Sequence, residues 1–320
     1  MLSHVQVVCF FTSYAVALAL EVSRLFFRMP VRLAVMLAFA VMGVVLQSSY
    51  LAHRAAISAM PLSSWHDWYL IVSWILAVTY VALVASRPLT NVGLFLLPVI
   101  MALTAVAWVF PTTESFPRDQ ALQLWGITHG IMLLLGTVAV SLGFVAGLMY
   151  LVQSWRLKHH VSPITGLKLP SLEWLQRVNK QSLVYSSCFI ALGLSAGIIL
   201  NAVKARGSGA GVPWSDSVVI SSAGLLVWLL AATMFEWLYK PAQQGRKVAY
   251  LTVASFLFLA VVMAMVLGGS SQHGRENKSQ KSEANAAQST PFLACPSAGR
   301  ATYSGVTFPA TLSSKKRGVT

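Results

Sequence analysis

The chain has 320 residues, of which 56% are apolar and only 10% are charged. Its mean hydropathy is +0.68, and this composition excludes an ordinary soluble domain and indicates a membrane protein. The net charge of +14 then indicates contact with the anionic headgroups of the lipid bilayer, and no nucleic acid is expected as a partner.

Eight apolar segments follow one another along the chain, each about as long as the roughly 20 residues that a membrane-spanning helix needs. They cover residues 5–26, 32–52, 68–86, 92–110, 127–152, 183–203, 217–239 and 248–268, with approximate ends. The pattern predicts an all-α fold, a polytopic membrane bundle of about eight transmembrane helices. Membrane helices tolerate the proline at Pro98, and the glycines of Gly193-x-x-x-Gly197 are typical of close helix packing.

The two ends of the chain differ in character. The first segment follows MLSHVQ, which lacks the basic start of a signal peptide, and no small-residue cleavage site is evident, so we expect a helix there. From about Ser270 onward the chain is rich in Ser, Gln, Asn, Ala and Lys and has no apolar periodicity. We therefore expect a transmembrane domain over residues 1–269 and a polar, disordered external tail over residues 270–320.

The loops between the segments predict an orientation. Twelve basic residues lie in the odd-numbered loops and four in the even-numbered ones, which predicts that the odd loops are cytoplasmic. Both termini then lie on the external face of a bacterial-type cytoplasmic membrane. His129, His273 and the loop GAGVPWSDSVV, which carries Trp214 and Asp216, fall on that face. Neutral imidazole is a good axial ligand for heme iron, and the face of a tryptophan suits a porphyrin.

Further segments flank this loop on both sides. HRAAISAMPLSSWHDWYLIVSW (53–74), THGIMLLLGTVAVSLGFVAGLMYLV (128–152) and LEWLQRVNKQSLVYSSCFIALGLSAGI (172–198) precede it. WLLAATMFEWLY (228–239), GRKVAYLTVASFLFL (245–259) and GGSSQHG (268–274) follow it. In order and spacing, the chain from about residue 40 to 274 resembles the cytochrome c assembly family of heme-handling membrane proteins, the CcsA, CcmC and HemX group. The hallmark of that family is an external tryptophan-rich loop flanked by two external histidines.

The resemblance implies a heme chaperone, or an accessory part of a heme-attachment system, rather than an enzyme. Heme b would be bound transiently at the external face and presented to apocytochrome c, with a second cytochrome c assembly membrane subunit as a further partner. His129 and His273 would be the axial ligands of the heme iron, and Trp214 and Asp216 would be remnants of the loop. Here the loop is reduced to PWSDSV, and Glu236 stands where heme-conducting members have a histidine, which favours a protein with an external site only or the HemX-like branch.

Each of these residues also has a structural interpretation. Trp214 can be a residue of the interfacial aromatic belt, where tryptophan is enriched in any membrane protein. His129 can be a hydrogen-bonded side chain that faces the bundle, and His273 can be part of a solvated surface. Arg54 and Arg118 can pair with heme propionates, because an arginine fork matches a carboxylate, or can contact lipid headgroups.

Two carboxylates lie within the apolar segments, Glu21 and Glu236, and intramembrane carboxylates are functional candidates. Each is expected to form a structural ion pair, with Arg24 at i+3 and with Lys240 at i+4, in preference to handling protons or heme. Together with Pro98 they support an alternative function, a transporter or permease-like protein with a polar site inside the membrane.

Overall fold

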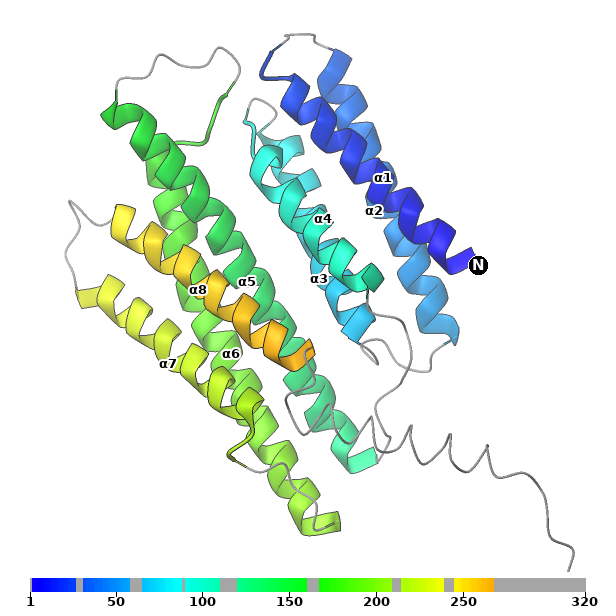
Figure 1. The fold of residues 1–320 in the computed structure, drawn as a ribbon, viewed down its shortest axis with the longest axis vertical. Helices are drawn as coiled ribbons and strands as arrows, with labels where there is room; N and C mark the ends of the chain where they lie inside the picture. The colour runs from blue at the N-terminus through cyan, green and yellow to red at the C-terminus, as the bar shows by residue number, and fades with distance from the viewer. Residues whose placement is uncertain are drawn as a thin grey trace, which may run out of the picture. The chain divides into compact units, whose positions relative to one another are not determined.

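The computed structural model describes residues 2–26, 31–57, 65–87, 90–109, 120–159, 167–208, 214–238 and 245–267, and within these ranges every regular element is an α-helix. The helices, shown in Figure 1, are α1 (Leu2–Ser23), α2 (Val31–Ile57), α3 (Trp65–Ser86), α4 (Gly93–Val109), α5 (Gln120–Lys158), α6 (Leu172–Ser208), α7 (Ser217–Leu238) and α8 (Gly245–Leu267). The chain divides into two units, Met1–Arg275 and Glu276–Thr320. The second unit lies outside the described residues, so the disordered tail stays a prediction.

Seven of these helices are long and apolar enough to cross a membrane, which confirms the polytopic helical bundle. The remaining helix, α4, has 17 residues with Pro98 inside it. It extends about 25 Å, slightly less than a hydrocarbon core of about 30 Å. In contrast, α5 and α6 have 39 and 37 residues. Each of these two helices is therefore long enough to extend beyond the bilayer.

The structure differs from the sequence expectation at the start of α6, which begins at Leu172 instead of near residue 183. Ser171 precedes the helix, and its hydroxyl accepts a hydrogen bond from the N–H of Trp174 at 3.4 Å, as an N-cap residue does. Glu173 and Arg177 then form an exposed i,i+4 ion pair at 3.2 Å. Capping and charge pairing thus extend the helix through a polar stretch that apolar periodicity does not detect.

The eight helices form two groups that meet at α5. In the first group α1 packs on α2 and α4, while α3 packs on α2 and α4. In the second group α5 packs on α6 and α8, while α7 packs on α6 and α8; α5 also touches α3 and α4. Large side chains fill the first group, including the fully buried Phe10, Tyr14, Met36, Tyr80 and Ile100.

Small residues hold the second group together. A Cβ atom added at any of three α5 glycines would come within 3 Å of a neighbouring helix: Gly136 against Ile190, Gly143 against Ser182, and Gly147 against Thr252. Hydroxyl groups also bond between helices, as between Ser187 of α6 and Thr233 of α7 at 2.9 Å. Close backbone approach and interhelical hydrogen bonds are the usual means of helix association in lipid.

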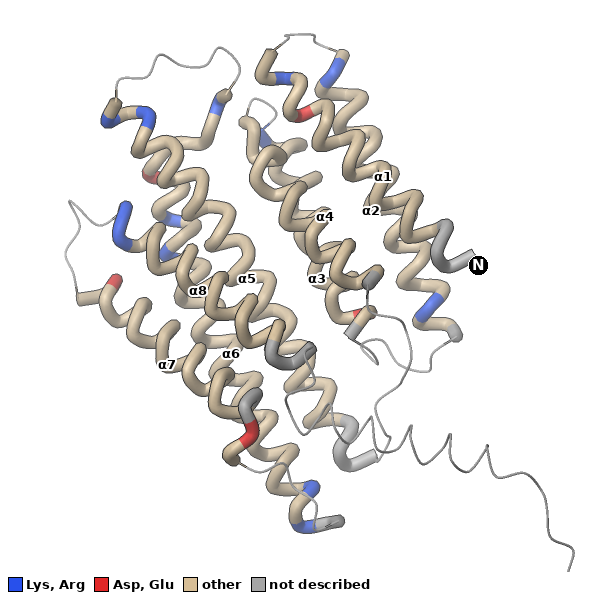
Figure 2. The backbone as a smooth tube through the Cα atoms, in the orientation of Figure 1, with Lys and Arg blue, Asp and Glu red and all other residues tan. Residues whose placement is uncertain are grey.

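Most Lys and Arg positions, blue in Figure 2, lie toward one end of this bundle. We call it the basic end; it carries the connections α1–α2, α3–α4, α5–α6 and α7–α8. Of the 13 Lys and Arg residues in the described ranges, ten lie near this end and three, Arg54, Lys204 and Arg206, lie near the opposite end. By the positive-inside rule, this asymmetry favours a cytoplasmic location for the basic end.

Candidate functional site

His129 lies near the start of α5, and its ring packs against α6. Its Nδ1 is 2.7 Å from the carbonyl oxygen of Gly193. Because a carbonyl oxygen can only accept, Nδ1 carries the proton, and the neutral ring then has Nε2 as its unprotonated nitrogen. This is the tautomer in which a histidine binds a metal through Nε2 while a backbone carbonyl holds its other nitrogen.

The second contact of this ring is with Gly197, one turn further along α6. A Cβ atom at Gly197 would lie 2.8 Å from both Cε1 and Nδ1 of His129, whereas a Cβ atom at Gly193 would lie 2.8 Å from the side chain of Leu133. The close packing expected for Gly193-x-x-x-Gly197 is thus confirmed. Gly197 leaves room for the imidazole ring, and the carbonyl of Gly193 binds it; we call His129, Gly193 and Gly197 the imidazole seat.

The imidazole seat lies far along α5 from the basic end. Arg156, at the basic end of α5, follows His129 by 27 residues, which corresponds to about 40 Å along a helix. A bilayer including its headgroups is about 40–45 Å thick. With Arg156 at one interface, His129 reaches the other interface instead of the bilayer centre.

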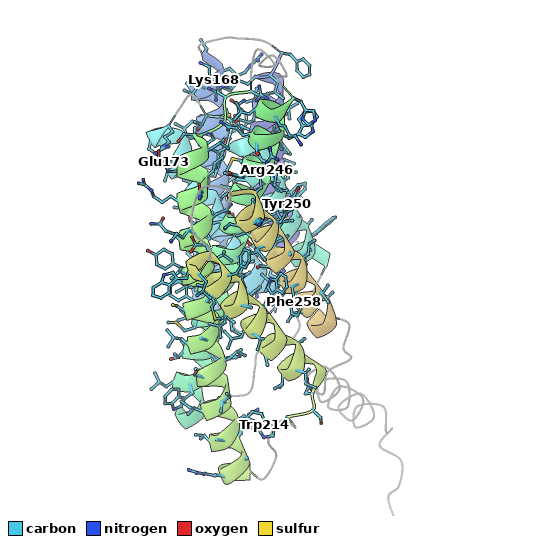
Figure 3. The ribbon with its side chains drawn as sticks, turned by 90° about the vertical axis from the view of Figure 1, so that its left-hand side faces the viewer. Lys168, Glu173, Trp214, Arg246, Tyr250 and Phe258 are labelled. Carbon is cyan, nitrogen blue, oxygen red and sulfur yellow. The ribbon has the colours of Figure 1, made fainter. Side chains whose placement is uncertain are left out.

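Trp214 and Asp216 lie on the turn that precedes α7. Trp214 is 64% exposed, and Figure 3 shows it at the end of the bundle opposite Lys168 and Glu173. Asp216 is buried, and its carbonyl oxygen accepts the N–H of Ile220 at 3.0 Å, which places it at the N-cap of α7. Aspartate is among the preferred residues at that position, so Asp216 has a structural role that the sequence interpretation missed.

The register of α6 against α7 relates this turn to the imidazole seat. Ser187 of α6 contacts Leu229 and Thr233 of α7 through hydrogen bonds of 3.3 and 2.9 Å. Counting along the two antiparallel helices from this contact places the start of α7 opposite about residue 201 of α6. That level is roughly 6 Å along the axis from Gly197. The turn with Trp214 and the imidazole seat therefore belong to the same end of the second helix group.

The proposed second ligand, His273, lies outside the described residues. The described part of α8 ends at Leu267, six positions before it. Because Thr252 of α8 lies against Gly147 of α5, the same counting places Leu267 opposite about residue 132 of α5. The last described turn of α8 is thus within about one helical turn of the level of His129.

A second histidine, His66, lies near the same end but in the first helix group. Its Nδ1 is 2.6 Å from the carbonyl oxygen of Ala107, and its Nε2 is 3.1 Å from the hydroxyl of Tyr50. Beside it, Arg54 binds Asp67 through two hydrogen bonds of 2.6 and 3.2 Å. These residues, which we call the His66 network, tie α2, α3 and α4 together.

The His66 network changes the interpretation of Arg54, which the sequence placed at heme propionates or lipid headgroups. The guanidinium instead binds the buried Asp67, while Arg118 lies outside the described residues. One feature of the sequence could have predicted this ion pair: Arg54 and Asp67 have opposite charges and lie on either side of the short connection between two consecutive helices.

The two intramembrane glutamates lie near the basic end. Glu21 and Arg24 approach to 4.0 Å, which confirms the expected i,i+3 pair. Glu236 binds Lys180 of α6 at 3.1 Å; the expected partner, Lys240, lies outside the described residues. The contact with Lys180 could not be seen in the sequence, because it depends on how α6 and α7 are aligned.

Other metal chemistry has little support in the described ranges. They contain no group of three or more His, Cys, Asp or Glu that could hold a metal ion, and Cys9 and Cys188 are free thiols. Comparison with protein-family models, with curated proteins and with solved structures finds no match to this chain. The resemblance to the cytochrome c assembly family therefore depends on the sequence segments quoted above.

Proposed function

We propose that the protein binds heme at the end of the bundle opposite the basic end and presents it during cytochrome c biogenesis. The observation that supports this function most strongly is the imidazole seat. Heme, when bound, would supply an iron that takes an imidazole nitrogen as an axial ligand. The neutral His129 ring, with Nδ1 bonded to Gly193, has the protonation pattern of such a ligand.

The imidazole seat fits this role because it fixes the ring before any ligand arrives. The carbonyl of Gly193 sets the tautomer and the orientation of the ring, as the outer-shell partners of metal-binding histidines do. The missing side chain at Gly197 provides the space that the ring fills. A side chain held in this way loses little rotamer freedom when it binds.

Other residues at this end have supporting roles in the proposal. Trp214 provides a large exposed ring against which a porphyrin can pack, and Asp216 stands at the N-cap position of α7. His273 is the second axial ligand. Because Arg54 is bound to Asp67, the basic residues at the end of α6, among them the exposed Arg206, are the stronger candidates for the heme propionates.

The proposal is restricted to one heme per chain. Glu236, at the position where heme-conducting relatives have a histidine, is bound to Lys180, and a carboxylate is a poor substitute for imidazole nitrogen at low-spin iron. Delivery then takes place on one face only, with apocytochrome c as the recipient and a second assembly subunit as the further partner.

The alternative function, a transporter with a polar site inside the membrane, is favoured by a different observation. The carboxyl group of Glu21 is completely buried within the first helix group, where a charge is costly. This group lies near the basic end, far from the imidazole seat. Mutations at the two places therefore separate the two functions.

Hemin titration of the detergent-purified, full-length protein tests the heme function. The wild-type protein should bind one hemin and show a Soret band with low-spin features; His129→Ala should lose the low-spin spectrum. Glu236→Ala is the matched control, and its spectrum should remain that of the wild-type protein. Retention of low-spin heme in His129→Ala together with its loss in Glu236→Ala would place the iron at the basic end and overturn the proposal.

A further inference from the structure

The Glu21 carboxyl group lies in the last turn of α1 and is shielded from solvent, with 0% of the residue exposed. Neither carboxyl oxygen accepts a hydrogen bond of normal geometry. Among the described residues, Arg24 is the cation paired with Glu21, at 4.0 Å from Oε2, which is longer than a direct hydrogen bond. A buried carboxylate with no donor at hydrogen-bond geometry is unfavourable.

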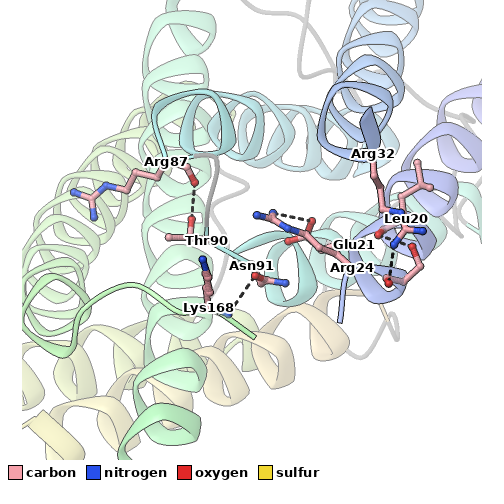
Figure 4. A network of polar contacts seen from close by, with 9 residues as sticks. Leu20, Glu21, Arg24, Arg32, Arg87, Thr90, Asn91 and Lys168 are labelled. Carbon is pink, nitrogen blue, oxygen red and sulfur yellow. Dashed lines mark hydrogen bonds and ion pairs between the residues drawn. The ribbon is translucent and has the colours of Figure 1, made fainter. Parts of the chain in front are cut away.

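Two further polar groups near Glu21 have no hydrogen-bond partner. Tyr80 of α3 is 0% exposed and its hydroxyl is unpaired. Asn91 is also fully buried, and although its Oδ1 accepts the N–H of Lys168 at 3.3 Å, its Nδ2 is unpaired. Figure 4 draws Glu21 and Arg24 together with Asn91 and Lys168 at this end of the bundle.

Gly93, the first residue of α4, connects these groups. A Cβ atom at Gly93 would lie 2.7 Å from Cε2 and 2.9 Å from the hydroxyl oxygen of Tyr80. The backbone N–H of Gly93 points toward the Glu21 carboxyl and favours its ionised form. Glu21 and Arg24 are also close enough to the Tyr80 hydroxyl to interact with it electrostatically. Gly93 thus lies close to both the Glu21 carboxyl and the Tyr80 phenol, at the N-terminus of α4.

The charges around the carboxyl group limit what it can bind. Arg24 of α1 lies beside it, Arg32 of α2 donates to the carbonyl of Ser23 at 2.9 Å, and Lys168 leads into α6. These cations would repel a bound metal ion, and the carboxylate would repel an anion. A proton is different, because it removes the buried charge and turns an acceptor-only carboxylate into a hydrogen-bond donor.

We propose that Glu21 is a proton-binding site of the first helix group: its carboxylate takes one proton from water at the basic end and becomes a neutral carboxylic acid. The O–H of this acid donates a hydrogen bond to the Tyr80 oxygen. The Arg24 side chain is 20% exposed, so this end of α1 is close enough to water for the exchange. Both protonation states are therefore accessible.

Infrared difference spectroscopy of the full-length protein during acidification tests this site. The wild-type protein should gain the carbonyl band of a protonated, weakly hydrogen-bonded acid, and Glu21→Gln should lack that band. Tyr80→Phe should keep the band at a shifted frequency, because the acceptor of the acid O–H is removed. Glu173→Gln is the matched control: it removes an exposed carboxyl group and should lose only the band of a water-bonded acid.

The opposite result is equally clear. Suppose that, at every pH, Glu21→Gln lacks a carboxylate band of the wild-type protein and the two proteins show the same acid bands. Glu21 then stays ionised beside Arg24, and the proposal is overturned. If Glu21→Gln does not fold, labelling of the wild-type protein with a lipophilic carbodiimide, which adds to protonated carboxyl groups, decides the matter. Labelling of Glu21 that falls as the pH rises supports the site, and absence of labelling at every pH overturns it.

Discussion

The imidazole seat and the His66 network lie near the same end of the bundle but differ in how deeply each histidine is buried and in the groups that hold it. His66 is 5% exposed, and protein groups contact both of its ring nitrogens, at 2.6 and 3.1 Å. His129 is only partly buried; its Nδ1 is held by Gly193, and its ring lies against the bare backbone of Gly197. The first ring completes a buried polar network, and the second is oriented by a backbone contact near an interface.

This difference shows that the surroundings of a histidine decide its chemical role. A buried ring bonded through both nitrogens is part of the fold, since its removal leaves buried polar groups unpaired. A partly buried ring whose tautomer is fixed by a backbone carbonyl is oriented in the way that metal-binding histidines are. We therefore expect mutations in the His66 network to lower stability and mutations in the imidazole seat to lower heme binding.

The largest loss of stability is expected for Asp67→Ala. This change removes the buried carboxylate that the partly buried Arg54 guanidinium binds, and breaking such a pair costs about 3 kcal/mol. Denaturant unfolding in detergent measures the free energy. The control is Glu173→Ala, which breaks an exposed ion pair and should cost about 0.5 kcal/mol or less. Equal losses in the two variants would show that the His66 network does not stabilise this end.

A loss of stability of similar size is expected for His66→Ala. The substitution leaves the buried Ala107 carbonyl and Tyr50 hydroxyl without the ring, and each unpaired group costs about 1–3 kcal/mol. Hemin titration of the folded variant should still give the low-spin spectrum. Loss of that spectrum without loss of stability would assign the ligand to His66 and remove the contrast between the two sites.

Gly197→Ala tests the imidazole seat without removing the histidine. The added Cβ atom would lie 2.8 Å from two atoms of the His129 ring, so the ring must move, and we expect hemin affinity to fall about tenfold, equivalent to about 1.4 kcal/mol. Gly126→Ala is the matched control, because a Cβ atom at this position of α5 meets nothing within 4 Å and should leave the affinity unchanged. The reverse order of the two variants would contradict the geometry.

The smallest effect is expected for removal of residues from about 280 onward. The segment has no apolar periodicity and little capacity to pack, while His273 is retained. Membrane insertion, stability and the hemin spectrum should all match those of the full-length protein. A truncated protein that inserts normally but binds no hemin would make the tail part of the site.

The sequence predicted those features that depend on local composition. The apolar segments indicated the helices, and the spacing of Glu21 and Arg24 indicated their pair. Gly193-x-x-x-Gly197 indicated a close contact, but its partner, the ring of His129, is 64 or more positions away in the chain. Long-range contacts of this kind follow from the alignment of helices, which a single sequence does not specify.

The same reason explains what the sequence interpretation missed. Glu236 binds Lys180 across two helices, and Arg54 binds Asp67 in place of a ligand. Asp216 is isolated in sequence, and only the backbone bond from Ile220 shows that it caps α7. In each case a charged residue that looked available in the sequence is engaged by the fold.

The most direct test of the heme proposal is imidazole rescue of His129→Gly. Removing the side chain should leave a space beside Gly197 that free imidazole can occupy, so that dissolved imidazole replaces the missing ligand. We predict that His129→Gly with hemin shows no low-spin spectrum, and that added imidazole restores it in proportion to occupancy, while His66→Gly gives low-spin heme without imidazole. Low-spin heme in His129→Gly before imidazole is added would contradict the assignment of His129 as an axial ligand.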